Sequence, residues 1–499
     1  MSARGPRRGA ALAALVALAA AVFVSGLDQT MVVTILPDVI VDLRVPFTAL
    51  DEASWIVTAY LLGYTVAMPL VGRLADLYGY RTLFAGCSAL FVGGSWWAAE
   101  SDGLWELVAA RGVQAVGGGG MVPIALAATS TLASGRAQVL ALGAVAGAAE
   151  AGGVLGPLYG TGMLELAGWR SVFWVNIPLG VCLLALVVLW LRARAEGIGR
   201  VDYLGGLLAA AVLLALTLGL SGGAVGIRGW PRGLLFAAAA AAALAFVRQE
   251  LSSGSPLVPL RVFRAPAFAA ASGANLLVGA ALIVALVEVP LFATVVLRDD
   301  TTGGGLTLLR LTALIPVGAL LGGWAAGRLP LAAVSAAGML VSAVGFGRLS
   351  WWGRGIGEPA LTIDLAVTGL GFGIVLAPLA ASALGAAGRG AQAVGASLLT
   401  VARMVGMMLA LAALSTWGLA EFDRRVGGYE LPLQEPGESD AAYDLRLDRY
   451  EEKVADAAVF VFDRLFLVAA GLCLAAAVLS AWLRAPDERS VAEQAGRSA

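Results

Sequence analysis

Residues 72–81 read GRLADLYGYR, a short charged stretch enclosed by two apolar runs near residues 53–72 and 82–99. Its glycines permit a tight turn and the close approach of two helices. Asp76 lies where its carboxylate could accept hydrogen bonds from a helix N-terminus or from an arginine, which would make a latch that can open. The spacing predicts a gating loop between two membrane-spanning helices, formed by Gly72, Asp76, Gly79 and Arg81.

The composition of the whole chain agrees with membrane helices on both sides of this loop. Of the 499 residues, 59% are hydrophobic and only 13% are charged, and the mean hydropathy is +0.85. A soluble domain carries about 25% charged residues. We therefore predict an integral membrane protein, and its spans must be helices because lipid offers no partner to an exposed backbone.

Missing residue types exclude several kinds of chemistry. The sequence has no histidine and only three isolated cysteines. These counts exclude Ser-His-Asp and Cys-His catalysis, zinc-histidine sites and a disulfide framework. A net charge of −1 argues against a nucleic-acid binder. We expect no enzyme, no metal and no cofactor, with a membrane-embedded enzyme and a channel as the rival classes.

Apolar runs of about the length that a bilayer requires recur along the chain. With the N-terminus in the cytoplasm, seventeen arginines face the cytoplasm and eight lie in the opposite loops. This asymmetry follows the positive-inside rule and predicts that both termini are cytoplasmic. We predict fourteen spanning helices, near residues 10–36, 53–72, 82–99, 104–130, 137–163, 171–192, 203–221, 232–250, 267–297, 305–326, 331–348, 361–386, 391–418 and 461–484.

Ionisable side chains at bilayer depth are costly unless they are paired or face water, so they are functional candidates. A low dielectric favours the neutral form of a carboxyl group, so buried acids can bind and release protons near neutral pH. Because both residues lie mid-helix in the second half of the chain, we predict that Glu288 pairs with Arg403. The alternative is that such pairs are static and only hold helices together. The residues that we assign to proton coupling are Asp28, Glu150, Glu288 and Arg403.

Two further motifs lie within predicted helices. Arg111 and Gln114 are three residues apart and share one face of the helix near 104–130. Gly152 and Gly156 allow a neighbouring helix to pack closely, and Pro157 removes a backbone hydrogen bond and bends its helix.

One loop is long and acidic. Residues 421–464 carry twelve acidic and six basic side chains. Within them, apolar residues recur at alternating intervals of four and three, which favours a helix with a narrow apolar seam. We predict an outer helical hairpin that prolongs the last two spans; the alternatives are a disordered acidic loop, or a seam that only packs one extension on the other. The seam residues are Tyr443, Leu447, Tyr450 and Val454.

Together these motifs resemble the major facilitator superfamily, in particular its fourteen-helix drug:proton antiporter group. The run from Leu27 to Thr30 with Leu36–Pro37 resembles the helix-1 motif of that group, and residues 72–81 resemble its loop signature. The Arg111 and Gln114 pair resembles the helix-4 motif, and residues 152–160 resemble the antiporter helix-5 motif. The sequence departs at Leu77 and Tyr80, where the family usually has basic residues, so the charge relay around Asp76 is expected to be weaker.

Three further segments resemble a narrower group. The stretches ALVEVPLF around Glu288, TIDLAVTGLGFG around Asp364 and VARMVGMM around Arg403 are similar to mycobacterial triacylglycerol exporters, which are also linked to drug efflux. That group works with a lipid-carrying lipoprotein on the outer side. The resemblance therefore implies a proton-coupled exporter of triacylglycerol-type lipid in a bacterial inner membrane, monomeric and with an outer lipoprotein partner. A broad multidrug:proton antiporter without a lipid role is the alternative.

The resemblance also implies the architecture. We expect an all-α membrane protein with a six-helix bundle at residues 1–193, two linker helices at 194–258 and a second six-helix bundle at 259–499. The second bundle includes the outer hairpin at 421–464.

Overall fold

The fold is helical throughout the part of the chain that the structure, a computed structural model, describes: residues 8–45, 53, 55–191, 202–221, 230–254, 256, 260–298, 301–388, 391–427, 432 and 439–484. This confirms the predicted all-α class. The α-helices are α1 (Arg8–Asp42), α3 (Trp55–Tyr78), α4 (Tyr80–Glu100), α5 (Leu104–Leu132), α6 (Gly135–Ala167), α7 (Arg170–Trp190), α8 (Tyr203–Ser221), α9 (Trp230–Ser252), α10 (Pro266–Val295), α11 (Thr301–Thr312), α12 (Leu314–Ala326), α13 (Leu331–Leu349), α14 (Ala360–Ala387), α15 (Gln392–Val426) and α16 (Asp440–Leu479), with short 3₁₀ helices η2 (Leu260–Arg264) and η3 (Ser480–Trp482).

Thirteen helices in the described residues are long and apolar enough to cross a membrane, which confirms a multi-pass membrane protein. The apolar part of α8, Leu204–Leu216, is shorter than the roughly 20 residues of a full span. The predicted count of fourteen spans therefore stays a prediction. The bounds of most of the predicted helices lie within a few residues of the observed ones, because lipid requires an uninterrupted apolar helix at each crossing.

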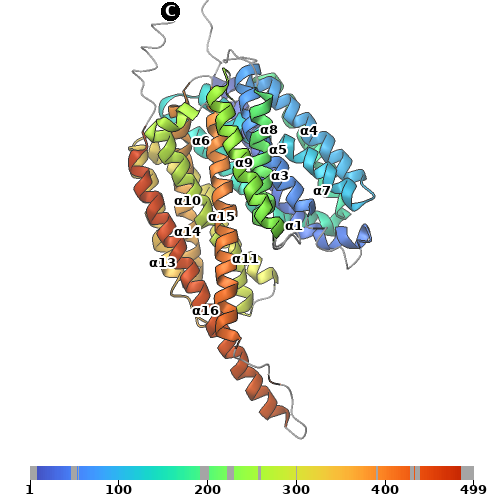
Figure 1. Ribbon diagram of the computed structural model, residues 1–499, viewed down its shortest axis with the longest axis vertical. Coiled ribbons are helices and arrows are strands. Elements are labelled where there is room, and N and C mark those ends of the chain that lie inside the picture. The colour runs from blue at the N-terminus through green and yellow to red at the C-terminus, as the bar shows by residue number, and fades with distance from the viewer. Residues whose placement is uncertain are drawn as a thin grey trace, which may run out of the picture.

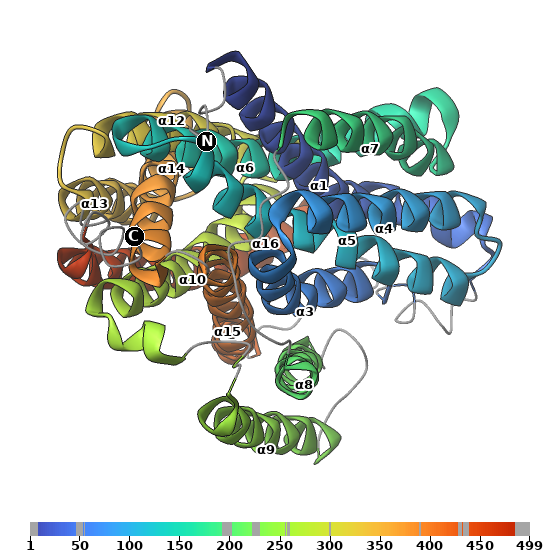
Figure 2. The same cartoon turned by 90° about the horizontal axis from the view of Figure 1, so that it is seen from above.

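The helices form two groups and a separate pair (Figures 1 and 2). In the first bundle, α1 packs along α6, α3 along α5, and α4 against α5 and α7. In the second bundle, α12 and α13 pack on α14, and α10 packs on α15 and α16. Helices α8 and α9 pair with each other beside them, and α8 contacts α3 and α15. The predicted domain boundaries at residues 193/194 and 258/259 lie outside the described residues.

One predicted helix, 305–326, is divided into α11 and α12 at Ala313. Pro316 has no backbone N–H, so the carbonyl group of Thr312 loses its usual partner four residues later. At the C-terminal end of α11, the Thr312 hydroxyl donates a hydrogen bond to the Leu308 carbonyl oxygen at 3.1 Å. The break is therefore a local consequence of the proline.

The last two helices are the longest of the second bundle. Helix α15 has 35 residues and α16 has 40, and a helix of 40 residues is about 60 Å long, twice the thickness of a hydrocarbon core. Figure 1 shows the first part of α16 extending beyond the other helices. The predicted prolongation of both helices agrees with these bounds, while residues 428–431 and 433–438 of the predicted hairpin lie outside the described residues.

Candidate functional site

Asp28 of α1 lies at the centre of a polar cluster inside the first bundle. Its side chain is fully buried and forms a salt bridge with Arg111 of α5, with 2.8 Å between Oδ2 and Nη1. Gln114 Nε2 donates to Asp28 Oδ1 at 2.9 Å, and Asn176 Nδ2 of α7 donates to the same oxygen at 2.6 Å. Three side chains from two helices, α5 and α7, thus donate to one carboxylate.

The charge of Arg111 is compensated on several sides. The guanidinium lies 3.9 Å from the ring centroid of Tyr60, a cation–π contact, and Nη1 donates to Gln114 Oε1 at 2.6 Å. Gln114 in turn donates to Ser95 Oγ at 2.8 Å. Removing one partner of a buried pair typically costs about 3–5 kcal/mol, because it leaves an uncompensated charge. Arg111 and Gln114 of α5, the residues of the predicted helix-4 motif, therefore bind and orient the Asp28 carboxylate of α1.

A second ion pair joins the two bundles. Arg403 Nη1 of α15 pairs with Glu150 Oε1 of α6, and both side chains are less than one-fifth exposed. The predicted pairing of Arg403 with Glu288 is therefore wrong. The reason is position along α10: Gly279 packs on the backbone of Arg403, and Glu288 follows nine residues later, about 13 Å further along the helix.

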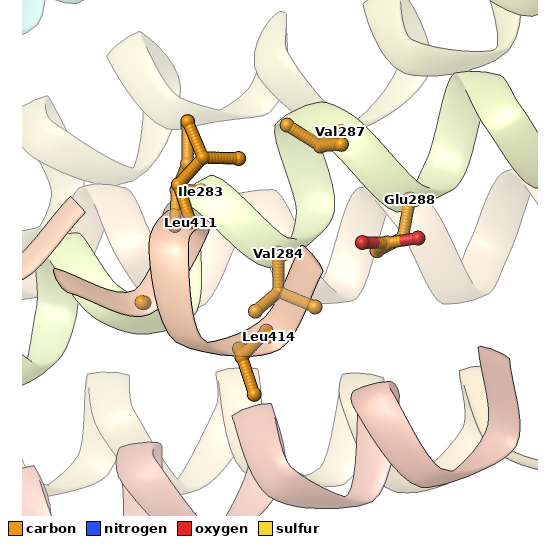
Figure 3. Close-up of a pocket in the computed structure, with 7 residues that line it drawn as sticks. Ile283, Val284, Val287, Glu288, Leu411 and Leu414 are labelled. Carbon is orange, nitrogen blue, oxygen red and sulfur yellow. The ribbon is translucent and has the colours of Figure 1, made fainter. Parts of the chain in front are cut away.

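Glu288 instead faces apolar side chains between α10 and α15 (Figure 3). It is 7% exposed, and it lines a small hollow of ≈ 10 Å³. No described cation forms an ion pair with it. Its neighbours in the hollow are aliphatic, from both helices: Ile283, Val284, Val287, Ala410, Leu411 and Leu414.

The gating loop connects the two bundles. The Asp76 carboxylate accepts the backbone N–H groups of Ala393 and Val394, at 3.1 and 3.0 Å, in the first turn of α15. This confirms the predicted bond to a helix N-terminus, where unpaired N–H groups and the helix dipole favour an anion. Gly79 between α3 and α4 has φ 92, a backbone conformation that favours glycine.

Tyr80 changes the prediction for this loop. It stands where the family usually has a basic residue, and its hydroxyl donates to Asp76 Oδ1 at 3.1 Å. Asp76 therefore accepts a hydrogen bond from a neutral hydroxyl where the family usually has a basic residue. Its hydrogen bonds to α15 do not require a positive charge at position 80. Arg81 lies half-buried in the first turn of α4.

Close approaches between the bundles gather at the end where α3 turns into α4, the predicted cytoplasmic side. A Cβ on Gly72 would lie 2.8 Å from the Ala393 carbonyl oxygen, so α3 and α15 touch there. Ser130 Oγ of α5 donates to Gln392 Oε1 at 2.7 Å. A Cβ on Gly323 of α12 would lie 3.0 Å from the backbone of α6. The two bundles are latched together on this side.

The glycines of residues 152–160, the predicted helix-5 motif, lie on α6 and pack it onto α1 within the first bundle. A Cβ on Gly152 or Gly156 would collide with the α1 backbone, as would one on Gly160. The Pro157 carbonyl oxygen accepts from Thr161 at 3.0 Å. The predicted close packing of this motif is confirmed.

Reasoning from the sequence missed the partners that come from other helices. Asn176 and Tyr60 were not singled out, although a polar residue within the apolar run of α7 is a signal of that kind. In the second bundle, Asp364 accepts from Arg348 Nε and from Trp352 Nε1, the latter at 3.1 Å. Asp364 had been noted only within a stretch of resemblance.

The predicted seam of the hairpin is half-buried along the first part of α16, at Tyr443, Leu447, Tyr450 and Val454. Ion pairs hold this part of α16 to loops of the second bundle on the predicted outer side. Arg298 Nη2 lies 2.7 Å from Glu451 Oε2, and Arg354 Nη2 lies 2.5 Å from Asp456 Oδ1. The first part of α16 is therefore tethered to the second bundle.

Known proteins resemble the chain over nearly all of its length. Residues 18–411 match the Major Facilitator Superfamily. A triacylglyceride transporter of Mycolicibacterium smegmatis is 35% identical, with 98% of this chain and 90% of that protein covered. A triacylglyceride transporter of Mycobacterium tuberculosis is 34% identical, with 95% of each chain covered. A human organic anion transporter has the same fold, with a TM-score of 0.58 at 15% identity, covering 93% of this chain and 99% of its own. The chain belongs to the major facilitator superfamily and is a membrane transporter.

Proposed function

We propose that this member of the major facilitator superfamily exports a triacylglycerol-type lipid from a bacterial inner membrane in exchange for protons. The observation that carries the coupling is the Glu150–Arg403 ion pair, because it is a part-buried contact between opposite charges that joins the first bundle to the second. The substrate class rests on the relatives named as triacylglyceride transporters, which match the chain through α16 and the hairpin region.

The cycle follows from the charges. Protonation of Glu150 and Asp28 from the outer side would remove the negative partners of Arg403 and Arg111, and would permit return to the inward-facing state. Release of the protons to the cytoplasm would restore both pairs and favour the outward transition with substrate bound. The Asp76 contact to α15 must open and close in each cycle, since it bridges the bundles on the predicted cytoplasmic side.

Export of a lipid requires that the released molecule neither returns to the bilayer nor disperses in water. The hairpin at residues 421–464 would receive the lipid along its apolar seam or dock an outer lipoprotein. Its net charge of −6, six basic minus twelve acidic side chains, keeps the flanks solvated. We further propose a monomer with both termini in the cytoplasm, built from bundles at residues 1–193 and 259–499 that rock about the site.

Reconstituted protein tests the function directly. Proteoliposomes would receive a labelled triacylglycerol or a cationic dye, with and without a pH gradient of either sign. We expect lipid movement that requires the gradient and is accompanied by counterflow of protons. Gradient-driven movement of the dye alone would favour the multidrug antiporter, and lipid movement that ignores the gradient would refute proton coupling.

Removing residues 426–456 and closing the gap with a short Gly/Ser linker tests the hairpin. We expect lipid export to fail while the helical core still folds and dye movement, if the wild-type protein shows it, continues. A matched control is Glu452→Gln with Asp456→Asn, which loosens the tether of α16 but keeps the seam. Wild-type lipid export by the deletion variant would refute a role for the hairpin.

A further inference from the structure

Glu288 of α10 is a buried acid to which the proposed cycle gives no task. Its side chain is 7% exposed, and no described residue forms a hydrogen bond or an ion pair with it. The other side chains that line its hollow are all aliphatic, so none of them compensates a charge (Figure 3). An unpaired carboxylate in such surroundings is costly, and the group keeps a proton instead. Glu288 is therefore a neutral carboxylic acid.

A neutral carboxyl group can bind what a carboxylate cannot. It has one O–H donor, whereas a carboxylate only accepts hydrogen bonds. Carboxylic acids that an apolar site keeps protonated can serve as hydrogen-bond donors. Because no described residue accepts from Glu288, its donor is available to the hollow that it lines. That hollow, of ≈ 10 Å³, has room for one water-sized group such as a carbonyl oxygen.

The hollow lies on the side of α15 that faces the first bundle. Arg403 marks that side, because its side chain reaches Glu150 of α6. Ala410 and Leu414 of the hollow come seven and eleven residues after Arg403, close to two and three full turns, so they share its face of α15. The hollow is therefore about 10–16 Å from the ion pair toward the predicted outer side. Transporters with rocking bundles bind their substrates at the contact between the bundles.

The walls of the hollow suit acyl chains. Ile283 and Val287 of α10 are half-buried, and Leu411 of α15 is 41% exposed, so aliphatic surface surrounds the single donor. Sites for small molecules combine such apolar walls with a few placed polar groups. A triacylglycerol has the complementary chemistry, because it carries apolar chains and three ester carbonyls that accept hydrogen bonds, with no donor and no charge.

We propose that Glu288 is a specificity-determining residue that, in its neutral form, donates a hydrogen bond to an ester carbonyl oxygen of the lipid. This inference rests on the proposed export of a lipid and deepens it, because it names the substrate group that the protein recognises. The proton stays on the acid, so the role differs from the proton coupling that the sequence suggested for Glu288. An aliphatic side chain at this position would contact acyl chains but could not distinguish an ester from an ether.

The test measures how strongly the purified protein prefers an ester. Wild-type protein in micelles would be titrated with a labelled triacylglycerol and with its triether analogue, which keeps the chains and the glycerol but has no carbonyl group. We expect the ester to bind roughly five- to tenfold more tightly, as for one hydrogen bond. Glu288→Gln, whose amide still donates, should keep the preference, while Glu288→Met should bind both lipids alike. The control is Glu165→Met, because Glu165 is exposed near the end of α6.

The outcomes separate this role from the function on which it rests. A wild-type protein that neither binds nor moves the triacylglycerol overturns the lipid function and the inference together. A wild-type protein that moves it without an ester preference, or with the same preference in Glu288→Met, overturns the inference alone, as expected if the hollow holds only water. Equal weakening of both lipids in Glu288→Met indicates a structural role and also overturns it.

A second measurement covers a Glu288→Met variant that fails to fold. Infrared spectra of a triacylglycerol with isotope-labelled carbonyl groups report hydrogen bonding to the ester directly. A carboxylic acid is a stronger donor than an amide, so the carbonyl band of the bound lipid should lie at lower frequency in wild-type protein than in Glu288→Gln. Identical bands in the two proteins overturn the inference.

Discussion

Asp28 in the first bundle and Glu288 in the second are both buried acids of a spanning helix, yet their surroundings are opposite. Asp28 receives side-chain hydrogen bonds from Arg111, Gln114 and Asn176. Glu288 borders a small hollow walled by aliphatic side chains (Figure 3). The comparison teaches that depth in the membrane does not define a role, because the cost of a buried charge depends on its partners.

The largest expected effect is that of Asp28→Asn. We expect export to fall by roughly 100-fold or more, since the amide cannot carry a proton, while expression persists because the amide oxygen still accepts a hydrogen bond. Labelled lipid transport under a pH gradient measures it. Asp102→Asn is the control, because that side chain is 96% exposed. Unaltered transport by Asp28→Asn would remove Asp28 from the mechanism and erase its contrast with Glu288.

A double-mutant cycle ranks next and tests which acid belongs to Arg403. Replacing Glu150 and Arg403 by glutamine, singly and together, should give a coupling of about 1–3 kcal/mol in the free energy of unfolding, since each single change leaves a buried charge alone. The matched cycle on Glu288 and Arg403 should be additive within about 0.5 kcal/mol. Equal coupling in both cycles would contradict the assignment of Arg403 to Glu150.

Loss of the Asp76 carboxylate should have a smaller effect than loss of a charge from an ion pair, because the groups that donate to Asp76 are neutral. Asp76→Ala should weaken the contact between the bundles by about 2 kcal/mol, through loss of the hydrogen bonds from Ala393 and Val394. Tyr80→Phe removes one hydrogen bond within the first bundle, and should lower the free energy of unfolding by about 1 kcal/mol. Spin labels on the two bundles at the predicted cytoplasmic side report the change as a longer distance distribution. An unchanged distribution in Asp76→Ala would show that the latch does not hold the bundles together.

Glu288→Gln gives the smallest expected change in stability. Because no described cation depends on Glu288, its neutralisation should alter the free energy of unfolding by less than about 0.5 kcal/mol. The melting temperature of the purified protein checks this, beside that of Asp28→Asn. A loss as large as that of Asp28→Asn would reveal a cationic partner for Glu288 and end the contrast between the two acids.

Much of the site was accessible from local sequence. The GRLADLYGYR stretch and the glycines at 152 and 156 act through backbone geometry, and the structure places both as expected. The partner of Arg403 was not accessible, because α10 packs along α15 whereas Glu150 lies on α6, which packs on other helices and is reached only by the long Arg403 side chain. The roles of these residues in proton coupling stay predictions.

The sequence by itself determined that this chain crosses a membrane as helices, and nearly where each helix begins and ends. Those properties depend on neighbours within one helix and on a solvent that cannot hydrogen-bond to the backbone. Only the tertiary structure decided that Asn176 completes the shell of Asp28, that Tyr80 supports Asp76, and that Arg403 reaches across to Glu150. Such pairs depend on how distant helices slide and rotate against each other, and that register is set by side-chain packing over the whole molecule.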